Sequence, residues 1–233
     1  MKAKKITIVK SVPEKRQYFD ACAATHALDL IGDRWALPVM RELMFGPKRF
    51  TDLRRDLPGI SANVLTQRLE GLEASGVLVR RKLPPPASAW VYELTAWGYA
   101  SEPIFQALGR WGAMSPLHDP TQPISANSVM LSFRTMIDRD KARAVEARVG
   151  FQLGDESFVG TVTDGGIQIA RGAGAVDVRF IGAPGVLASA AYGDEPLAAL
   201  VARGELVVEG DMALAARFLG LFTLPEKAAR LSA

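Results

Sequence analysis

The sequence predicts two domains: a mainly α-helical N-terminal domain with a two-stranded hairpin, and a C-terminal α+β domain in which helices cover an antiparallel sheet. The chain has 233 residues, more than one hydrophobic core usually organises. Residues 1–118 contain 17 Lys and Arg against 11 Asp and Glu (net +6), whereas residues 119–233 contain 11 against 14 (net −3). All four tryptophans lie at or before Trp111, and three prolines fall within 115–123. We therefore expect a flexible basic arm (1–17), a helical domain (18–114), a Pro-rich linker (115–125) and an α+β domain (126–233).

Two short helices are predicted in the second quarter of the chain. Pro58 disfavours helical dihedral angles at the residue before it and so ends the first helix. Ser61 is a favoured N-cap for the second, and Gly76 supplies a left-handed C-terminal cap. Apolar residues recur at helical spacing in both: Phe50, Leu53 and Leu57, then Leu65, Leu69 and Leu72.

The second helix carries a polar face opposite its leucines. At 100° per residue this face holds Asn63, Thr66 and Gln67. Asn and Gln pair with adenine edges, and Thr contacts either kind of base edge, so we predict that these three residues read DNA bases. The alternative is a polar face that only meets water. Arg68 lies nearer the leucine stripe, where we expect it to brace the fold.

A basic hairpin follows these helices. The β-rich runs 77–82 and 90–94 are separated by a proline-rich tip at 83–89. Cations on such a hairpin suit DNA phosphates, although a solvated charge run is the alternative. Two helices followed by a basic hairpin are typical of a winged helix-turn-helix that binds double-stranded DNA. The predicted phosphate contacts are Lys48, Arg49, Thr51, Arg80, Arg81, Lys82 and Ser88.

From Cys22 to Gly112 the chain resembles the HxlR-type winged-helix transcriptional regulators, which are related to the MarR-type repressors. The resemblance rests on five blocks in order: LDLIGDRW (28–35), GPKRF (46–50), LPGIS (57–61), LTQRL (65–69) and YELT (92–95). It implies a homodimer on a pseudo-palindromic operator. It also implies that the helix after Ser61 lies in the major groove and that the hairpin at 77–94 is the wing.

Thr95 is predicted to cap a last helix of this domain, which Pro103 would kink. One seam of this helix is rich in large apolar residues. In relatives the partner subunit would cover the seam, together with the helix that starts near Cys22; packing within one subunit is the alternative. The seam consists of Trp97, Ser101, Ile104, Leu108 and Trp111.

The C-terminal half is predicted to contain a helix, an antiparallel meander and further helices. Turn residues separate the strand-like runs. The expected elements are a helix at 126–137, strands at 143–153, 156–163, 166–171 and 175–181, helices at 184–192 and 195–203, a strand at 205–209 and a helix at 211–222.

Residues 200–219, which follow ValAspValArgPhe, resemble the end of a sterol-carrier-protein-like domain. The resemblance implies a sheet covered by helices around an apolar cavity for a lipid or other hydrophobic molecule. Aromatic residues in such a domain also form ordinary core, and that alternative stays open. The candidate pocket residues are Phe133, Phe180, Phe218, Leu219 and Phe222.

Cys22 is the only cysteine, so neither an intramolecular disulfide nor a thiolate metal site is expected, and we predict no metal and no cofactor. A buried free cysteine acts as a small apolar residue. The HxlR resemblance implies a second role, a redox sensor, although CysAlaAla replaces the frequent Cys-Pro. The sequence has no long apolar run and no signal peptide, which favours a cytoplasmic protein without a membrane partner.

The leading hypothesis is a dimeric transcription regulator whose C-terminal domain senses a hydrophobic small molecule. A second hypothesis makes Cys22 the sensor of oxidants or electrophiles and the C-terminal half structural. A third is a lipid carrier or enzyme that uses the winged helix for protein contacts. We predict no catalytic residues, because two histidines and one cysteine offer no nucleophile and base at useful spacing. The operator, the direction of regulation and the effector are left open.

Overall fold

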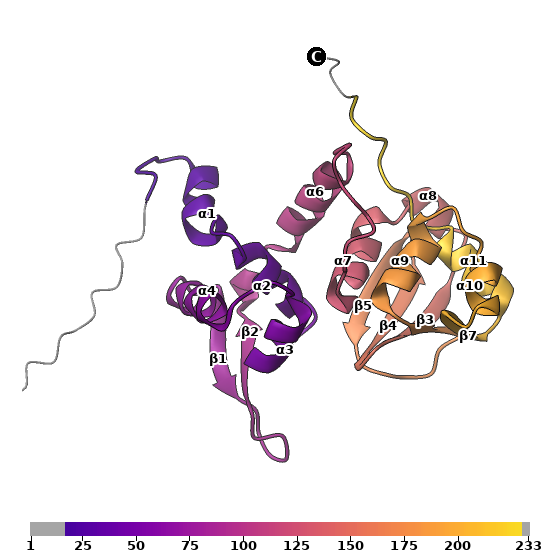
Figure 1. Cartoon of the computed structure of the whole chain (residues 1–233), viewed down its shortest axis with the longest axis horizontal. Coiled ribbons are helices and arrows are strands. Elements are labelled where there is room, and N and C mark those ends of the chain that lie inside the picture. The colour runs from indigo at the N-terminus through magenta and orange to yellow at the C-terminus, as the bar shows by residue number, and fades with distance from the viewer. Residues whose placement is uncertain (1–16, 230–233) are drawn as a thin grey trace, which may run out of the picture.

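A computed structural model describes residues 17–229 of the chain. Helices and a hairpin form the N-terminal half, and a five-stranded sheet with its own helices forms the C-terminal half (Figure 1). Residues 1–16 of the predicted basic arm lie outside the described residues. No helix within 17–229 has the length and apolar character that crossing a membrane requires.

The helix-turn-helix and the wing form where the sequence predicts them. Ser61 caps the second helix by accepting a hydrogen bond from the Val64 backbone nitrogen at 3.3 Å, and Gly76 ends it at φ +74°. The leucine stripe of this helix is buried. The elements are α1 (Ala23–Ile31), α2 (Ala36–Leu43), α3 (Phe50–Asp56), α4 (Ala62–Ala74), β1 (Leu78–Lys82) and β2 (Trp90–Leu94), and the two strands pair antiparallel.

The single helix predicted after Thr95 is two helices, α5 (Ala96–Tyr99) and α6 (Glu102–Ala113). Thr95 caps α5 as expected, because its hydroxyl accepts from the Gly98 backbone nitrogen at 3.0 Å. The predicted kink at Pro103 is wrong. Pro103 lies in the first turn of α6, where a missing N–H breaks no helical hydrogen bond, so it helps to begin a helix.

The C-terminal half has the predicted elements, a further short helix at Arg139–Ala142 and a different sheet order; the strand predicted at 143–153 begins only at Ala147. Strands β3 (Ala147–Leu153), β4 (Glu156–Thr163), β5 (Gly166–Arg171), β6 (Val178–Gly182) and β7 (Leu206–Gly210) are arranged as β5-β4-β3-β6-β7. The predicted meander is wrong at β6, which crosses over and pairs parallel to β3, while all other neighbours are antiparallel. This pairing sets Phe180 beside Phe151 in the sheet centre, with ring centroids 6.1 Å apart.

Helices cover one face of this sheet. They are α7 (Ala126–Met136), α8 (Arg139–Ala142), α9 (Pro184–Tyr192), α10 (Leu197–Ala202) and α11 (Met212–Leu219). Contacts with the strands are made by α7, α9, α10 and α11. The predicted α+β class, with helices on a largely antiparallel sheet, is therefore confirmed.

The five candidate pocket residues are buried side chains of the core under these helices. Phe133 stacks on Phe222 at 4.1 Å between ring centroids, and Phe218 lies 5.8 Å from both Phe133 and Phe180. Leu219 belongs to the same core cluster. These side chains pack against one another in the place where the apolar cavity was expected. They therefore form core and do not line an open cavity.

The two halves of the chain share buried contacts. Helix α7 packs against both α6 and α2 of the N-terminal half. The segment from Ser115 to Ile124, between α6 and α7, contains no helix or strand. Lys227, near the end of the described chain, donates hydrogen bonds to the carbonyl oxygens of Ala113 and Ser115 at 2.9 and 3.1 Å. The domain boundary at 115–125 stays our proposal. The two halves on either side of this boundary are in contact with each other.

Candidate nucleic-acid interface

The outward face of α4 presents three polar side chains to solvent. Asn63, Thr66 and Gln67 are exposed, and their side chains make no hydrogen bonds within residues 17–229. Their donors and acceptors are therefore available to another molecule. The same helix is held from behind by the buried Leu65, Leu69 and Leu72. Arg68, at the edge of the leucine stripe, pairs with Asp33, as expected of a bracing cation.

The wing has two different faces. Arg80 and Lys82 point to the same side as Trp90 and Tyr92, and the Arg80 guanidinium lies 4.8 Å from the Trp90 ring centroid. Arg81 lies on the other side, where it forms an ion pair with Glu93. The side chains of Arg80 and Lys82 form no ion pair with a carboxylate among the described residues. Ser88, at the proline-rich tip, is exposed.

Of the cations near α3, Arg49 is accessible and Lys48 is not. Arg49 and Thr51 are exposed at the beginning of α3, where backbone N–H groups favour an anion. Lys48 forms an isolated antiparallel bridge with Tyr92, with backbone hydrogen bonds of 3.1 and 2.9 Å. Its side chain turns inward, away from any DNA. The prediction that Lys48 contacts phosphate is wrong, because its ammonium group is buried and bound to three carboxylates.

Comparisons with known proteins match both halves of the chain. The family described as HxlR-like helix-turn-helix matches residues 30–118, and the SCP-2 sterol transfer family matches residues 130–223. The HTH-type transcriptional regulator YtcD of Bacillus subtilis strain 168 is 38% identical over 103 residues, which cover 43% of this chain and 78% of YtcD. The chain belongs to the HxlR-like helix-turn-helix family.

Further relatives of the HxlR-like half are also described as HTH-type transcriptional regulators. YodB of Bacillus subtilis strain 168, also an HTH-type transcriptional regulator, is 36% identical over 36% of this chain and 76% of its own length. The structure of its reduced form is similar with a TM-score of 0.38, at 33% identity, over 42% of this chain and 98% of that one. The chain is thus an HTH-type, DNA-binding transcriptional regulator and not an enzyme, and it also carries an SCP-2-like domain.

The HxlR-like half is joined to the SCP-2-like half by a buried ionic cluster, which we call the junction. The Lys48 ammonium lies 3.1 Å from Glu42, 2.7 Å from Asp56 and 2.9 Å from Glu156. Glu42 belongs to α2 and Asp56 to α3, whereas Glu156 begins β4 of the other half. A single lysine therefore connects two helices of the DNA-binding half, α2 and α3, to the sheet.

Arg171 and Asn127 extend the junction from the SCP-2-like side. Arg171 donates to Glu156 at 2.8 Å, to the Asn127 side-chain oxygen at 2.9 Å and to the Phe45 carbonyl at 3.2 Å. Asn127 donates to the backbone carbonyl of Glu42 at 2.6 Å. Because these buried polar groups satisfy one another across the two halves, separating the halves would leave several of them unpaired.

The charges of the junction stabilise each other's ionised forms. Burial by itself would lower the pKa of Lys48, but Glu42, Asp56 and Glu156 raise it above its ordinary value. Burial would likewise raise the pKa of Asp56, but hydrogen bonds from Arg55 and Lys48 lower it. Both shifts favour the ionised forms of Lys48 and Asp56. Sequence reasoning missed the junction, because its acidic members are scattered over α2, α3 and β4 without a common spacing.

Cys22 is an exposed free thiol at the N-cap of α1. The interpretation of Cys22 as a buried apolar residue is therefore wrong. Backbone N–H groups of Thr25 and Ala24 lower the pKa of its thiol below the ordinary value, because they stabilise the thiolate. Accessibility and a lowered pKa are two requirements of a reactive cysteine.

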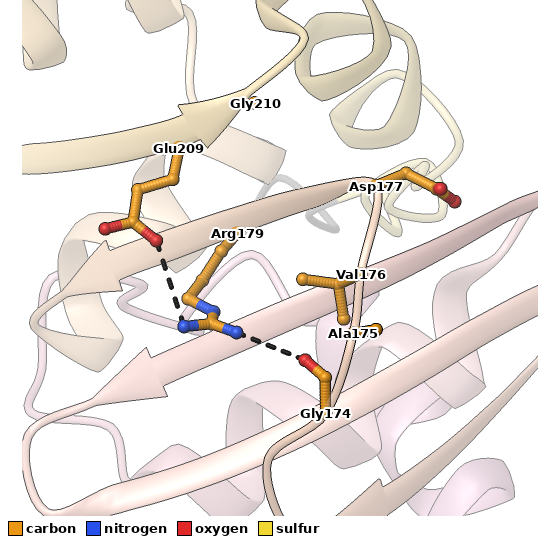
Figure 2. Close-up of a pocket in the computed structure, with 7 residues that line it drawn as sticks. All are labelled: Gly174, Ala175, Val176, Asp177, Arg179, Glu209 and Gly210. Carbon is orange, nitrogen blue, oxygen red and sulfur yellow. Dashed lines mark hydrogen bonds and ion pairs between the residues drawn. The ribbon is translucent and has the colours of Figure 1, made fainter.

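A shallow pocket of about 300 Å³ lies between β6, β7 and the loop before β6 (Figure 2). Arg179 crosses it, with a nitrogen 3.8 Å from Glu209 and a hydrogen bond of 3.2 Å to the Gly174 carbonyl. Because these groups offset one another's charge in an open polar setting, the pocket does not suit a hydrophobic molecule.

Proposed function

We propose that this regulator binds a pseudo-palindromic operator as a homodimer, with α4 in the major groove and the wing along the phosphate backbone. The observation that carries this proposal is the exposed, unpaired set Asn63, Thr66 and Gln67 on a helix that is rigidly held from behind. Arg49, Thr51, Arg80, Arg81, Lys82 and Ser88 are the proposed phosphate contacts, and Lys48 is withdrawn from that set. We propose the cytoplasm as the compartment, because the regulator must meet DNA.

The first experiment selects operator sequences from random duplexes and measures affinity against salt. Phosphate contacts release counterions, so log affinity should fall linearly with log salt concentration. Gln67→Ala should cost about 1 to 3 kcal/mol at particular base pairs and relax the preference there. Glu70→Gln, on the same exposed helix, is the matched control and should leave the preference unchanged. Equal loss on all duplexes for Gln67→Ala would contradict a base-reading role.

Dimerisation is supported by an exposed apolar seam on α5 and α6. Trp97 is 56% exposed and Trp111 is 74% exposed, and Ile104 and Leu108 lie between them. Leu28 of α1 is exposed as well. Such a concentration of large exposed apolar side chains favours a protein partner, and a second copy of the chain provides the matching surface.

We further propose that the C-terminal half responds to a hydrophobic small molecule and changes the affinity for DNA. The junction supports this, because movement of β4 would pull on Lys48 and therefore on α2 and α3. Native mass spectrometry of freshly purified protein tests for a ligand. A dimer that carries excess mass, removable by delipidation, would support a bound hydrophobic molecule; a bare dimer would argue against one that is retained.

The second candidate is a thiol sensor, favoured by the exposure and the lowered pKa of Cys22. In that case the thiolate reacts with an oxidant or electrophile, and the C-terminal half is structural. Cys22→Ser separates the two candidates. Loss of an oxidant or quinone response in this variant would support the thiol sensor, whereas an unchanged response would refute it.

A further inference from the structure

An open pocket of about 320 Å³, called the cavity below, lies where α2, α6 and α7 meet, at the contact between the two halves of the chain. Figure 1 shows α7 on the side of the five-stranded sheet that faces α2 and α6. Leu37, Pro38, Phe105, Leu108 and Leu131 supply most of its wall. A volume of this size and an apolar lining are typical of sites for small organic molecules.

The hydroxyl groups that line this cavity have already used their protons. Ser132 donates to the Val129 carbonyl at 2.9 Å, and Thr135 donates to the Leu131 carbonyl at 2.7 Å. The third is Ser128, whose hydroxyl lies 2.8 Å from Ser125 Oγ. The single hydroxyl proton of Ser125 goes to Glu42 at 2.7 Å, so Ser128 must donate to Ser125. No hydroxyl in the wall keeps a proton for a ligand.

Arg41 is the one lining side chain with donors to spare. A guanidinium has five N–H donors. Arg41 uses one on Nε, at 3.1 Å, and one on a terminal nitrogen, at 2.9 Å, and both go to the same Glu42 oxygen. Glu42 also receives Lys48 and Ser125, so its negative charge is shared among several partners. The free edge of Arg41 therefore offers a positively charged, donor-only end to an otherwise apolar cavity.

We propose that this cavity binds a small monocarboxylic acid, with its carboxylate on Arg41 and its hydrocarbon chain against the apolar wall. This inference rests on the proposed function, because it assigns the effector site and the effector's chemical class. It also moves that site out of the phenylalanine core, which is filled, and into the contact between the halves. A carboxylate suits Arg41 because both its oxygens accept hydrogen bonds from a planar guanidinium.

The position of the site explains how its ligand would act on DNA binding. Arg41 and Glu42 are adjacent on α2, so a carboxylate on the free edge of Arg41 shares this guanidinium with Glu42 of the junction. Leu108 is shared between the cavity wall and the exposed seam of α6. A bound acid would thus contact three elements at once: α2, which carries part of the junction, α6 of the proposed dimer interface and α7 of the C-terminal half.

Calorimetry on the full chain with sodium octanoate tests the site directly and without DNA. Octanoate should bind at least about tenfold more tightly than 1-octanol or octylammonium, because only the anion gains a charge-assisted hydrogen bond. Arg41→Gln should weaken octanoate binding about tenfold or more. The matched control Arg110→Gln, an exposed arginine of α6 outside the cavity, should leave it unchanged.

A second variant keeps the test valid if Arg41→Gln disturbs the junction. Gly109→Leu adds a side chain to the cavity wall without touching Glu42, and a methyl group there would meet only Thr135 Cγ2 at 3.8 Å. It should abolish octanoate binding while the protein stays folded. Equal binding of octanoate and 1-octanol, or full binding by either variant, would overturn the site.

The effector role has separate outcomes. Octanoate that binds as expected and changes the affinity for the selected operator duplex supports it. Binding without any such change overturns the effector role alone. A third outcome is that octanoate dissociates the dimer and does not bind the cavity while the dimer is intact. This would show that a second copy of the chain occupies the cavity, and it would overturn the proposal. If no duplex binds at all, the proposed function fails, and calorimetry still decides the site.

Discussion

At Lys48 a single ammonium group meets three carboxylates in a place that is closed to water. Taking charges out of water is expensive, and here the cost is offset only while all partners are present. Glu42 is fully buried and also binds Arg41 and Ser125. The junction is for this reason sensitive to the loss of any one member.

Replacing the lysine should therefore destabilise the whole protein. Lys48→Met removes the one ammonium group that Glu42, Asp56 and Glu156 share, and removing one partner of a buried pair costs about 3 to 5 kcal/mol. Urea denaturation should show this loss in the free energy of unfolding. Lys82→Met, an exposed lysine of the wing, should change the same quantity by less than about 0.5 kcal/mol. A comparable change in the free energy of unfolding of both variants would contradict a stabilising role of Lys48 in the junction.

The junction should also give stability a defined pH dependence. The pKa of Asp56 is lowered by folding, so its contribution is complete above its ordinary value of 3.8 and is lost as pH falls through the folded-state pKa. The pKa of Lys48 is raised, so its contribution is complete below 10.5 and is lost as pH rises through the folded-state pKa. The difference in unfolding free energy between wild type and Lys48→Met should stay level between these limits. A steady change of that difference across neutral pH would be inconsistent with this assignment.

At the scale of elements, the wing offers DNA two faces with different charge. The side chain of Arg81 is held by Glu93, whereas the side chains of Arg80 and Lys82 on the other face form no ion pair with a carboxylate among the described residues. Arg81→Ala should weaken binding to all duplexes alike and reduce the salt slope by about 1. Glu93→Gln should have the opposite effect, a tighter binding at low salt, because it frees Arg81. Fluorescence anisotropy on operator and scrambled duplexes separates these outcomes, and a sequence-dependent effect of either change would refute a phosphate role.

The contact between α5 and the wing depends on Gly98. A methyl group there would lie 2.1 Å from the Val77 carbonyl oxygen and 3.1 Å from Leu94 Cβ, so the helix would have to lift from the hairpin. Gly98→Ala should cost about 1 to 3 kcal/mol of unfolding free energy in thermal or urea denaturation. The matched change Gly71→Ala, in α4 with nothing within 4 Å, should stabilise by about 0.5 to 1 kcal/mol. Stabilisation by both changes would show that α5 is not tightly packed.

For the whole molecule, the exposed seam should decide the oligomeric state. Trp111→Lys places a charge within the proposed interface and should convert dimer to monomer in sedimentation experiments. Val207→Lys is the control, because Val207 is also exposed and apolar but lies on β7, away from the seam. A monomeric wild type would contradict the proposed homodimer. A Trp111→Lys variant that dimerises with an unchanged dissociation constant would contradict the seam as its interface.

Local patterns in the sequence were sufficient for most elements. Ser61, Thr95 and Gly76 mark helix boundaries through contacts within a few residues, and the leucine stripe of α4 follows from helical periodicity alone. Both family matches agree with the motifs that predicted them. The polar face of α4 could be identified in the same way, because the orientation of side chains on a helix is set by its geometry.

What only the tertiary structure decided depends on residues far apart in the chain. The parallel pairing of β6 with β3, the burial of Lys48 and the filled phenylalanine core each arise from long-range packing, for which no local spacing exists. A lysine beside an arginine has the same sequence pattern whether it faces DNA or three carboxylates. The sequence by itself therefore determined the family, most of the helices and the candidate base-reading residues. The contact between the halves, and with it the junction and the cavity beside Arg41, was decided by folding, because it brings together side chains that are distant in the sequence.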